Sequence, residues 1–240
     1  MTVAVEVPEL PAFLDRRTEK PVVFTYTMLH TYENICPHQS WRRFVKKEFP
    51  FISTPEMEWG NKVHTAFEYR VGGGKPLPEN MAHWEPFATP FDGKGAKTEM
   101  KVALSPKGHV VDYFEKINIR YRCKIDTSVV NGEKAFLADW KTGNSKYENP
   151  FELAIQAMHL HAKNPQLKEI KGSYVWLKEN RMSKPYDLSD TQATWTKCET
   201  IVLKMESDRR AGHFEKRQGP LCGYCPCLDC ENNTSADARV

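Results

Sequence analysis

The chain has 240 residues, a hydrophobic fraction of 40% and a formal net charge of +3. This length and composition permit one large domain with a substantial core, and we expect a single domain because no Pro- or Ser-rich linker divides the chain. No apolar run approaches the roughly 20 residues of a membrane span, which argues against a membrane partner, and the small net charge does not by itself indicate nucleic acid. The acidic, Pro-containing start does not resemble a secretory signal and predicts a cytoplasmic protein.

Hydrophobic periodicity predicts an α/β fold, with strands crossed by helices. Residues 1–22 and 231–240 lack periodicity and are predicted to be flexible ends, which leaves 23–230 as the folded domain. Between these ends the pattern predicts, in chain order, helices at 27–47 and 56–71, strands at 98–105, 117–130 and 134–141, a helix at 151–163, a strand at 172–178 and a final helix from Ser189 to about Arg210.

Capping residues and apolar faces support the predicted helices. Thr25 or Thr27 is expected to begin the first helix, and Ser189 with Gln192 has the spacing of a capping box at the start of the last one. The second helix is expected to have one face that points into the protein, made by Met57, Gly60, Val63, His64, Phe67 and Val71.

The dipeptide Asn131-Gly132 between two β-rich runs predicts a hairpin with a type I′ turn. A loop of these two residues would place Asp126 opposite Leu137, so Asp139 would lie diagonal to Asp126 on the same face, with α-carbons about 7–8 Å apart. Alternation along the second strand puts Lys141 on that face as well and turns the opposite face toward the core, with Phe136, Ala138 and Trp140.

Two carboxylates at this distance repel each other unless a cation lies between them, and hard oxygen ligands suit Mg²⁺ or Mn²⁺. Such an ion lowers the pKa of a bound water and polarises a phosphoryl oxygen, and a neighbouring ammonium such as that of Lys141 stabilises charge that develops on phosphate. The alternative is that Asp139 and Lys141 form an ordinary surface salt bridge at the end of a strand.

The residues around this hairpin resemble the core of the PD-(D/E)XK nucleases, specifically the RecB-type exonuclease branch. The run KID, followed thirteen residues after its Asp by LADWKTG, is similar to the two strands that carry the branch's Asp and Asp-Tyr-Lys-Thr motifs. WGNKVH resembles its helical Gly-x-x-x-His through Gly60 and His64, and AIQAMHLH has Gln156 where the branch has a Gln. TYTMLHTYENICPHQSWRRF is similar to the N-terminal helix of the branch, so the resemblance extends over residues 25–230.

This resemblance implies a restriction-endonuclease-like core, in which helices flank a central mixed β-sheet. It also implies a deoxyribonuclease that depends on Mg²⁺ or Mn²⁺, with the ion held by His64, Asp126 and Asp139. Lys141 would act at the attacking water and the scissile phosphate, and Gln156 would orient the site. Glu99 would be the additional acid that many members carry before the Asp motif.

Some positions depart from the family pattern or allow another interpretation. Cys123 replaces a Gly three residues before Asp126, and Leu160 replaces a Tyr four residues after Gln156; neither change removes a metal ligand. The simpler alternative for Glu99 is an exposed glutamate on a strand. The simpler alternative for His64, beside Val63 and Phe67, is a histidine at the edge of the core that binds no metal.

Seven cysteines without a secretory signal make a disulfide framework an unlikely use of the thiols, and CGYCPCLDC holds four of them. Cys222, Cys225 and Cys230 have metal-ligand spacing and need one more ligand. The iron–sulfur members of the branch pair one N-terminal Cys with three C-terminal ones, which implies Cys36 as the fourth ligand of a structural 4Fe–4S cluster. The alternative is a local Zn²⁺ site that uses Cys227.

Two functions from different classes follow. The first is a metal-dependent exonuclease that acts on DNA, with single-stranded or free ends as its expected substrate, in recombination, repair or phage DNA metabolism. The segment FEKRQGPLCGYCP resembles the end of small bacteriophage nucleases, which would place the protein in the host cytoplasm. The second is a catalytically inactive, nuclease-like module for DNA binding or assembly, held by an iron–sulfur or zinc clasp.

Overall fold

The computed structural model describes residues 14–15 and 20–235. The predicted flexible ends therefore lie largely outside the described residues, at 1–13, 16–19 and 236–240. Within the described part of the chain, none of the helices combines the length and the apolar character that crossing a membrane requires.

The chain forms two compact units, each made from segments that are separate in the sequence. Unit 1 consists of Met1–Phe51, Leu104–Arg122 and Trp195–Val240, and unit 2 of Ile52–Ala103 and Cys123–Thr194. The residues predicted for catalysis all fall in unit 2, and the predicted cysteine ligands all fall in unit 1. The limits of the single domain expected at 23–230 stay a prediction.

A seven-stranded mixed β-sheet confirms the predicted α/β class. Its strands run in the order β4-β3-β5-β6-β7-β8, and β9 also pairs with β7. The β5–β6 pair is antiparallel and the β6–β7 pair is parallel. The strands are β3 (Lys97–Leu104), β4 (Val110–Val111), β5 (Tyr121–Asn131), β6 (Lys134–Lys141), β7 (Glu169–Trp176), β8 (Arg181–Met182) and β9 (Tyr186–Asp187).

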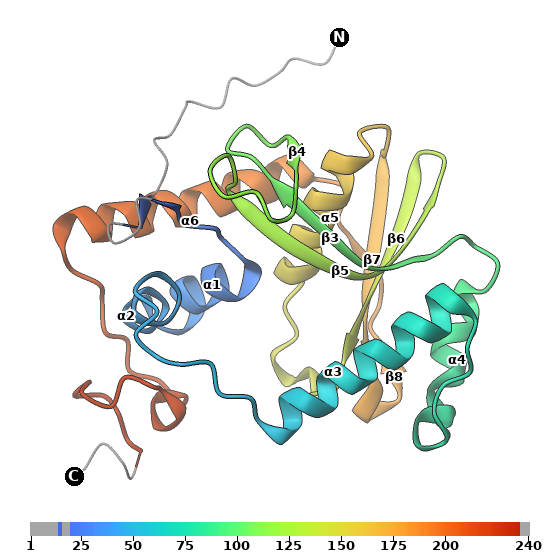
Figure 1. Ribbon diagram of the computed structural model, residues 1–240, viewed down its shortest axis with the longest axis horizontal. Helices are drawn as coiled ribbons and strands as arrows, with labels where there is room; N and C mark the ends of the chain where they lie inside the picture. Colours follow the sequence, from blue (N-terminus) through green and yellow to red (C-terminus); the bar gives the residue numbers. More distant parts are fainter. Residues whose placement is uncertain (1–13, 16–19, 236–240) are drawn as a thin grey trace. The chain divides into compact units, whose positions relative to one another are not determined.

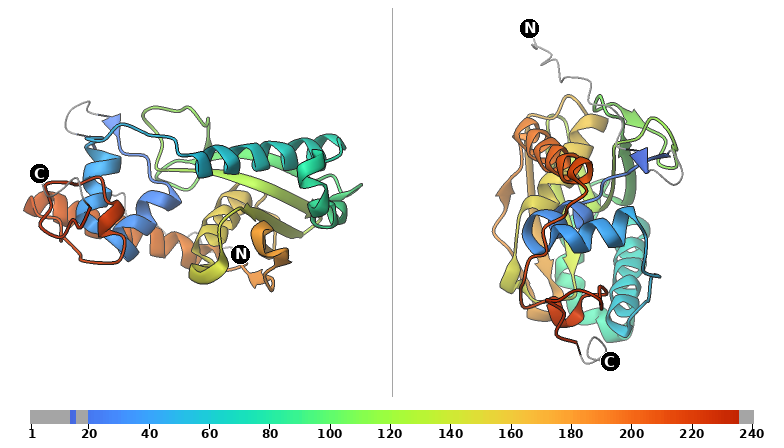
Figure 2. Two further views of the ribbon diagram at one scale, coloured as in Figure 1. Left: turned by 90° about the horizontal axis from the view of Figure 1, so that it is seen from below. Right: turned by 90° about the vertical axis from the view of Figure 1, so that its left-hand side faces the viewer.

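In unit 2, helices α3 (Pro55–Phe67) and α5 (Phe151–Lys163) cover opposite faces of the sheet (Figures 1 and 2). Thr54 accepts a hydrogen bond from the backbone N–H of Met57 and begins α3, with Pro55 at a position where no N–H is needed. The predicted inward face of α3 is confirmed at Val63 and Phe67, but Met57 is exposed because it lies in the first turn.

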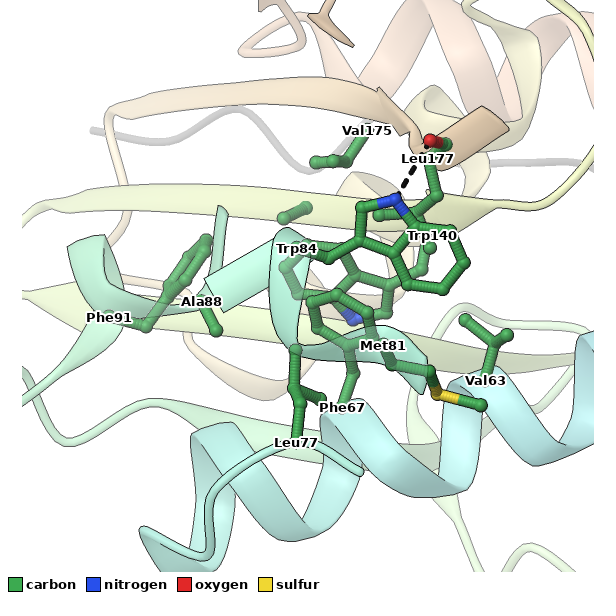
Figure 3. Packing of buried hydrophobic residues seen from close by; sticks show 11 residues of the cluster. Val63, Phe67, Leu77, Met81, Trp84, Ala88, Phe91, Trp140, Val175 and Leu177 are labelled. Carbon is green, nitrogen blue, oxygen red and sulfur yellow. Dashed lines mark hydrogen bonds between the residues drawn. The ribbon is translucent and has the colours of Figure 1, made fainter. Parts of the chain in front are cut away.

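The core beneath α3 is built around Trp140 of β6 (Figure 3). The Trp140 ring stacks on Phe67 with 4.1 Å between ring centroids, and the Trp84 indole N–H donates to the carbonyl of Leu177 at 2.9 Å. Phe136, Ala138 and Trp140 therefore pack on this core as predicted. Three short helical segments that pack on this core were not predicted, because their apolar residues show no clear period. They are Glu79–Trp84, α4 (Glu85–Ala88) and Thr89–Phe91.

The hairpin between β5 and β6 forms, but its register differs from the predicted one by two residues. Asn131 pairs with Lys134, so the loop is Gly132-Glu133, with φ of 59° at Gly132. Glu133 does not adopt a positive φ, which matches a type II′ turn rather than type I′. A shift of two preserves the faces of both strands but brings Asp126 and Asp139 closer together than predicted, because each directly adjoins the Thr127–Ala138 pair.

In unit 1 the predicted first helix is broken into shorter pieces. Thr25, rather than Thr27, caps α1 (Tyr26–His30), which continues as a π-helical turn over Thr31–Ile35. Cys36 is extended, with φ of −158° and ψ of 117°, because the following Pro37 disfavours a helical backbone at this position. Helix resumes as α2 (Pro37–Ser40) and ends after a second π-helical turn at Trp41–Val45.

Contacts within unit 1 join this N-terminal region to the C-terminal segment. Trp41 stacks on Phe214 with 4.4 Å between ring centroids, and the His38 backbone N–H donates to the carbonyl of Glu215 at 3.1 Å. Tyr32 also donates a hydrogen bond to Asp208, at 2.6 Å. The unit further contains the short strands β1 (Leu14–Asp15) and β2 (Lys20–Pro21), which pair with each other.

The last long helix, α6 (Thr191–Ala211), does not begin with the predicted capping box. Asp190 accepts the hydrogen bond from the Ala193 backbone N–H, at 2.9 Å. The Ser189 hydroxyl instead accepts from the Ile170 backbone N–H and donates to Asp187. The prediction that Ser189 caps α6 is wrong, because its side chain makes hydrogen bonds to residues of the sheet instead. The predicted inward residues are confirmed, since Trp195, Val202 and Met205 are buried.

His159, on the buried face of α5, should make the stability of the protein sensitive to acid. Its side chain is fully buried, and burial lowers its pKa from 6.5 to about 4. The unfolded chain therefore binds the proton more tightly, so stability present at pH 7 is lost as the pH falls below 6.5, by about 2 kcal/mol at pH 5. Urea unfolding should show a smaller loss between pH 7 and pH 5 for His159→Phe than for the wild type.

A matched control is His161→Phe, on the same helix at a less buried position. This variant is expected to keep the wild-type dependence of the unfolding free energy on pH. An equal loss of stability in His159→Phe and in the wild type would contradict the assignment of this loss to His159.

Candidate active site

His64, Glu99 and Asp126 form the group of side chains that is best placed to hold a metal ion. One ligand atom from each lies within 4.8 Å of the other two. His64 Nδ1 is 3.3 Å from Asp126 Oδ2 and 3.7 Å from Glu99 Oε1. In the part of the chain that the structure describes, no other group of three His, Cys, Asp or Glu residues meets this condition.

His64 reaches this group from α3, one turn after Gly60. Its side chain is 29% exposed and lies beside the carboxylates, while its neighbours Val63 and Phe67 are buried in the core. A Cβ at Gly60 would make an ordinary contact, 3.5 Å from the Thr142 hydroxyl, so packing within the chain does not demand a glycine there. His64 thus lies beside two carboxylates as well as at the edge of the core.

Glu99 supplies the second carboxylate from an unusual backbone conformation on β3. Its φ is 52°, a left-handed value that costs energy for a residue with a side chain. The Glu99 side chain is only 10% exposed and also forms an ion pair with Lys124 of β5. The alternative of an exposed strand glutamate is therefore wrong, and the Glu99 carboxylate lies beside His64 and Asp126.

Asp126 is fixed by the hairpin itself. Its Oδ2 accepts a hydrogen bond from the backbone N–H of Trp140 at 3.0 Å, and the Trp140 indole N–H donates to the Thr127 hydroxyl at 3.1 Å. The same Trp140 side chain anchors β6 in the core. The position of the candidate ligand is therefore coupled to the packing on the opposite face of the sheet.

Asp139, the second aspartate of the motif, lies in an adjoining network instead of in the three-residue group. Gln156 Nε2 of α5 donates to Asp139 Oδ1 at 2.6 Å, and Lys141 Nζ is 2.7 Å from Asp139 Oδ2. Lys141 also donates to Glu152 Oε2 at 2.7 Å. The Asp139–Lys141 ion pair exists, but an Asp139 side chain that is 3% exposed does not fit the surface salt bridge considered from the sequence.

The electrostatics of the two networks are coupled. Burial raises the pKa of Asp126, and repulsion from Asp139 raises it further. Burial and the Asp139 charge likewise raise the pKa of Glu152 to about 7. Burial lowers the pKa of His64, but its hydrogen bond and attraction to Asp126 outweigh this effect and the net shift is upward. Burial of Lys141 is similarly outweighed by Asp139 and Glu152, which raise its pKa.

This arrangement suits a divalent cation. Four carboxylates lie in the two networks and carry a charge of −4 when ionised: Glu99, Asp126, Asp139 and Glu152. Lys124 and Lys141 supply +2, so an excess of −2 remains when His64 is neutral. Two carboxylates and one imidazole are a mixed oxygen and nitrogen donor set, which suits Mn²⁺ better than Mg²⁺ because Mg²⁺ takes oxygen ligands. A dication beside Asp126 would relieve the repulsion that raises its pKa.

The two departures from the family pattern leave these groups intact. Cys123 lies near the acidic network, and its thiol pKa is raised by burial first and then by Glu152, Asp126 and Asp139. The thiol is thus kept protonated and uncharged. Leu160 is buried on α5 and adds no polar group to the site.

Glu152 and Lys124 also lie at this site but were not among the predicted residues. Glu152 precedes Gln156 by four residues on α5, so the helical i,i+4 spacing was a signal that could have found it. Lys124 lies two residues before Asp126 on β5 and therefore points to the same side of the strand. Its contact with Glu99 depends on strand pairing and could not be read from the sequence.

The cysteines of unit 1 occupy a separate region. The backbone N–H of Arg217 donates to Cys36 Sγ at 3.5 Å, and that of Gly219 donates to Cys222 Sγ at 3.3 Å. The expected fourth ligand, Cys36, thus lies against the C-terminal segment. Cys225 interacts with Cys227, and Cys230 follows in the same segment. In the described residues, no three cysteine sulfurs lie within 4.8 Å of one another.

Comparisons with known proteins show the fold of the chain. No family model matches it, and no curated protein sequence matches it either. Among solved structures, it is similar to SSO0001, with 15% identity, a TM-score of 0.52 and coverage of 89% of this chain and 88% of that one. It is also similar to a candidate exonuclease from Eubacterium rectale, with 9% identity, a TM-score of 0.50 and coverage of 92% of both chains. The chain therefore shares its mixed α/β fold with these two structures.

The three-residue group predicts that Mn²⁺ stabilises the protein against heat. By mass action, Mn²⁺ at 100 times its dissociation constant should add about 2.7 kcal/mol to the unfolding free energy of the wild type. Asp126→Asn and Glu99→Gln should each lose most of this gain in thermal unfolding with and without Mn²⁺. Because burial and Asp139 make the ionised Asp126 unfavourable without metal, Asp126→Asn should not lower the melting temperature in EDTA.

Glu169→Gln is the control for this measurement, since Glu169 pairs with Lys134 and Lys171 on the surface of unit 2. It should keep the full response to Mn²⁺. A full response in Asp126→Asn would show that the metal binds elsewhere.

Proposed function

We propose that the protein is a metal-dependent DNA exonuclease that hydrolyses phosphodiester bonds. The observation that carries this proposal is the His64–Glu99–Asp126 group next to the Asp139–Lys141 pair, on a nuclease-like fold. An acidic site with one ammonium beside it fits the demands of phosphodiester hydrolysis, which needs charge stabilisation at a phosphate and an activated water.

Each residue of the site has a role in this proposal. His64, Glu99 and Asp126 would hold Mg²⁺ or Mn²⁺, with Asp139 adjacent as a further carboxylate. The bound ion would polarise a phosphoryl oxygen and make a water more acidic. Lys141 would donate a hydrogen bond to the attacking water or the scissile phosphate, and Gln156 would fix the orientation of the Asp139 carboxylate.

The substrate is proposed to be DNA with single-stranded or free ends. Support comes from the resemblance of the four sequence motifs to the RecB-type exonuclease branch and from the structural likeness to a candidate exonuclease. Recombination, repair or phage DNA metabolism are the processes in which such an activity would be used.

The second candidate is an inactive nuclease-like module that binds DNA or takes part in assembly. Its support is limited to the gathering of the two ends of the chain in unit 1, which suits a structural clasp. The complete set of Asp126, Asp139, Lys141 and Gln156 favours the enzyme, because a protein used only for binding has no need for a buried ammonium between carboxylates.

Asp139→Asn and Lys141→Ala are each expected to reduce cleavage of linear single-stranded DNA by about 100-fold or more, because each removes a charged group at the reacting phosphate. The assay is release of labelled nucleotides with Mg²⁺ or Mn²⁺ supplied, next to a reaction with EDTA. Circular dichroism and thermal unfolding serve as the control for folding. Near wild-type cleavage in either variant would show that Asp139 and Lys141 form only a structural ion pair.

The cysteines are proposed to hold a structural 4Fe–4S cluster through Cys36, Cys222, Cys225 and Cys230. Support comes from the hydrogen bonds that Cys36 and Cys222 accept from backbone N–H groups, since such bonds are typical of sulfurs that carry negative charge. The role of the cluster would be to join the two ends of unit 1. A Zn²⁺ site that includes Cys227 is the alternative, and its support is the contact between Cys225 and Cys227.

Colour and metal content distinguish these two sites. Protein purified without oxygen should be brown and contain about four irons per chain, because iron–thiolate bonds absorb visible light, whereas a zinc site is colourless. Cys36→Ala is expected to lose the colour and the iron, and Cys227→Ala to keep both. A colourless protein whose single zinc depends on Cys227 but not on Cys36 would contradict the cluster.

A further inference from the structure

Lys141 is held by a carboxylate that lies outside the four motifs. Glu152, in the first turn of α5, accepts a hydrogen bond from Lys141 Nζ at 2.7 Å. Both side chains are 26% exposed, so this ion pair is well shielded from water compared with a surface pair. The Tyr174 ring completes the surroundings of the ammonium, with its centroid 5.4 Å from Nζ.

Asp139 alone is poorly suited to position this ammonium. Its Oδ1 accepts from Gln156, and its Oδ2 lies 2.7 Å from Lys141 Nζ. A cation bound beside Asp126 would also attract the nearby Asp139 carboxylate. The attraction between Asp139 and Lys141 would then be weaker. Glu152 belongs to a different element, α5, and its carboxylate remains available to hold Lys141 under those conditions.

We propose that Glu152 is a positioning residue that holds the Lys141 ammonium in place for catalysis. An ammonium has three N–H donors. One of them donates to Glu152, and Asp139 Oδ2 lies 2.7 Å from Nζ as an ion-pair partner, so a donor remains for the attacking water or the scissile phosphate. This inference rests on the proposed nuclease function for the identity of the reaction, whereas the holding of Lys141 rests on the geometry alone.

Glu152→Gln tests whether the negative charge of Glu152 holds Lys141 in place. The amide has the shape of the carboxylate but no charge, so Lys141 would turn toward Asp139 and compete with the metal ion there. Because a misplaced catalytic group costs up to about 100-fold in rate, kcat on a single-stranded oligonucleotide with Mn²⁺ should fall about 10- to 100-fold, with little change in KM. The Mn²⁺ concentration for half-maximal rate should rise as well.

Two further variants separate positioning from a structural role. Glu152→Asp keeps the charge on a shorter side chain and should recover part of the lost kcat. Glu148→Gln is the matched control, since Glu148 is a partly buried glutamate of unit 2 that accepts from Trp176 and Tyr186 and has no contact with Lys141 among those the structure describes. It should keep wild-type kcat even where its melting temperature falls.

Labelling of Lys141 measures the same positioning without DNA. Reductive methylation followed by mass spectrometry should modify Lys141 several-fold faster in Glu152→Gln than in the wild type, and no faster in Glu148→Gln, because a lysine that is held by a carboxylate is shielded from the reagent. An unchanged rate of labelling in Glu152→Gln overturns the positioning role, and so does an unchanged kcat in an active enzyme. A wild type that cleaves no DNA with Mg²⁺ or Mn²⁺ overturns the proposed function instead, and the labelling rate then decides the positioning role.

Discussion

Burial of carboxylates around one strand pair is the constraint on which the functional part of this structure depends. Glu99, Asp126, Asp139 and Glu152 have side chains between 3% and 26% exposed. Carboxylates removed from water repel each other and take up protons unless positive charge lies close by. Burial in the first place, and repulsion from Asp139 in the second, raise the pKa values of Asp126 and Glu152. Lys124, Lys141 and His64 each contribute to offsetting it, but an excess of negative charge remains.

Trp140 links this acidic site to the hydrophobic core. Its ring packs on Phe67 beneath α3, its backbone N–H bonds Asp126, and its indole N–H bonds Thr127. The residues on either side of it, Asp139 and Lys141, point to the other face of β6. Alternate residues of one strand thus pack in the core and form the polar contacts of the candidate site, and rigid packing on one face holds the polar groups on the other face in place.

The candidate site draws on five elements of unit 2, namely α3, β3, β5, β6 and α5. Helix α3 brings His64, strand β3 brings Glu99 through a left-handed backbone, the β5–β6 hairpin brings the aspartates, and α5 brings Gln156 and Glu152. Strain at Glu99 is tolerated because the surrounding sheet determines its position. In unit 1, polar and stacking contacts join an N-terminal segment to a C-terminal segment.

The sequence by itself determined the α/β class, most helices and strands, and the faces of the hairpin. These follow from local patterns: the period of apolar residues, the Asn131-Gly132 signal and the alternation along β6. Through motifs that resemble a known family, it also predicted six residues for the site: His64, Glu99, Asp126, Asp139, Lys141 and Gln156. A two-residue error in register did no harm to the faces, since an even shift preserves alternation.

Only the tertiary structure decided which charges meet. Glu152 could have been suspected from its spacing to Gln156, but its bond to Lys141 requires α5 to pack on β6. The same holds for Lys124 beside Glu99, which depends on strand pairing, and for the extended Cys36 beside Arg217, which depends on the meeting of the two chain ends. The physical reason is that periodicity and propensity act within a few residues, whereas electrostatic coupling depends on distance in space, which the sequence does not specify.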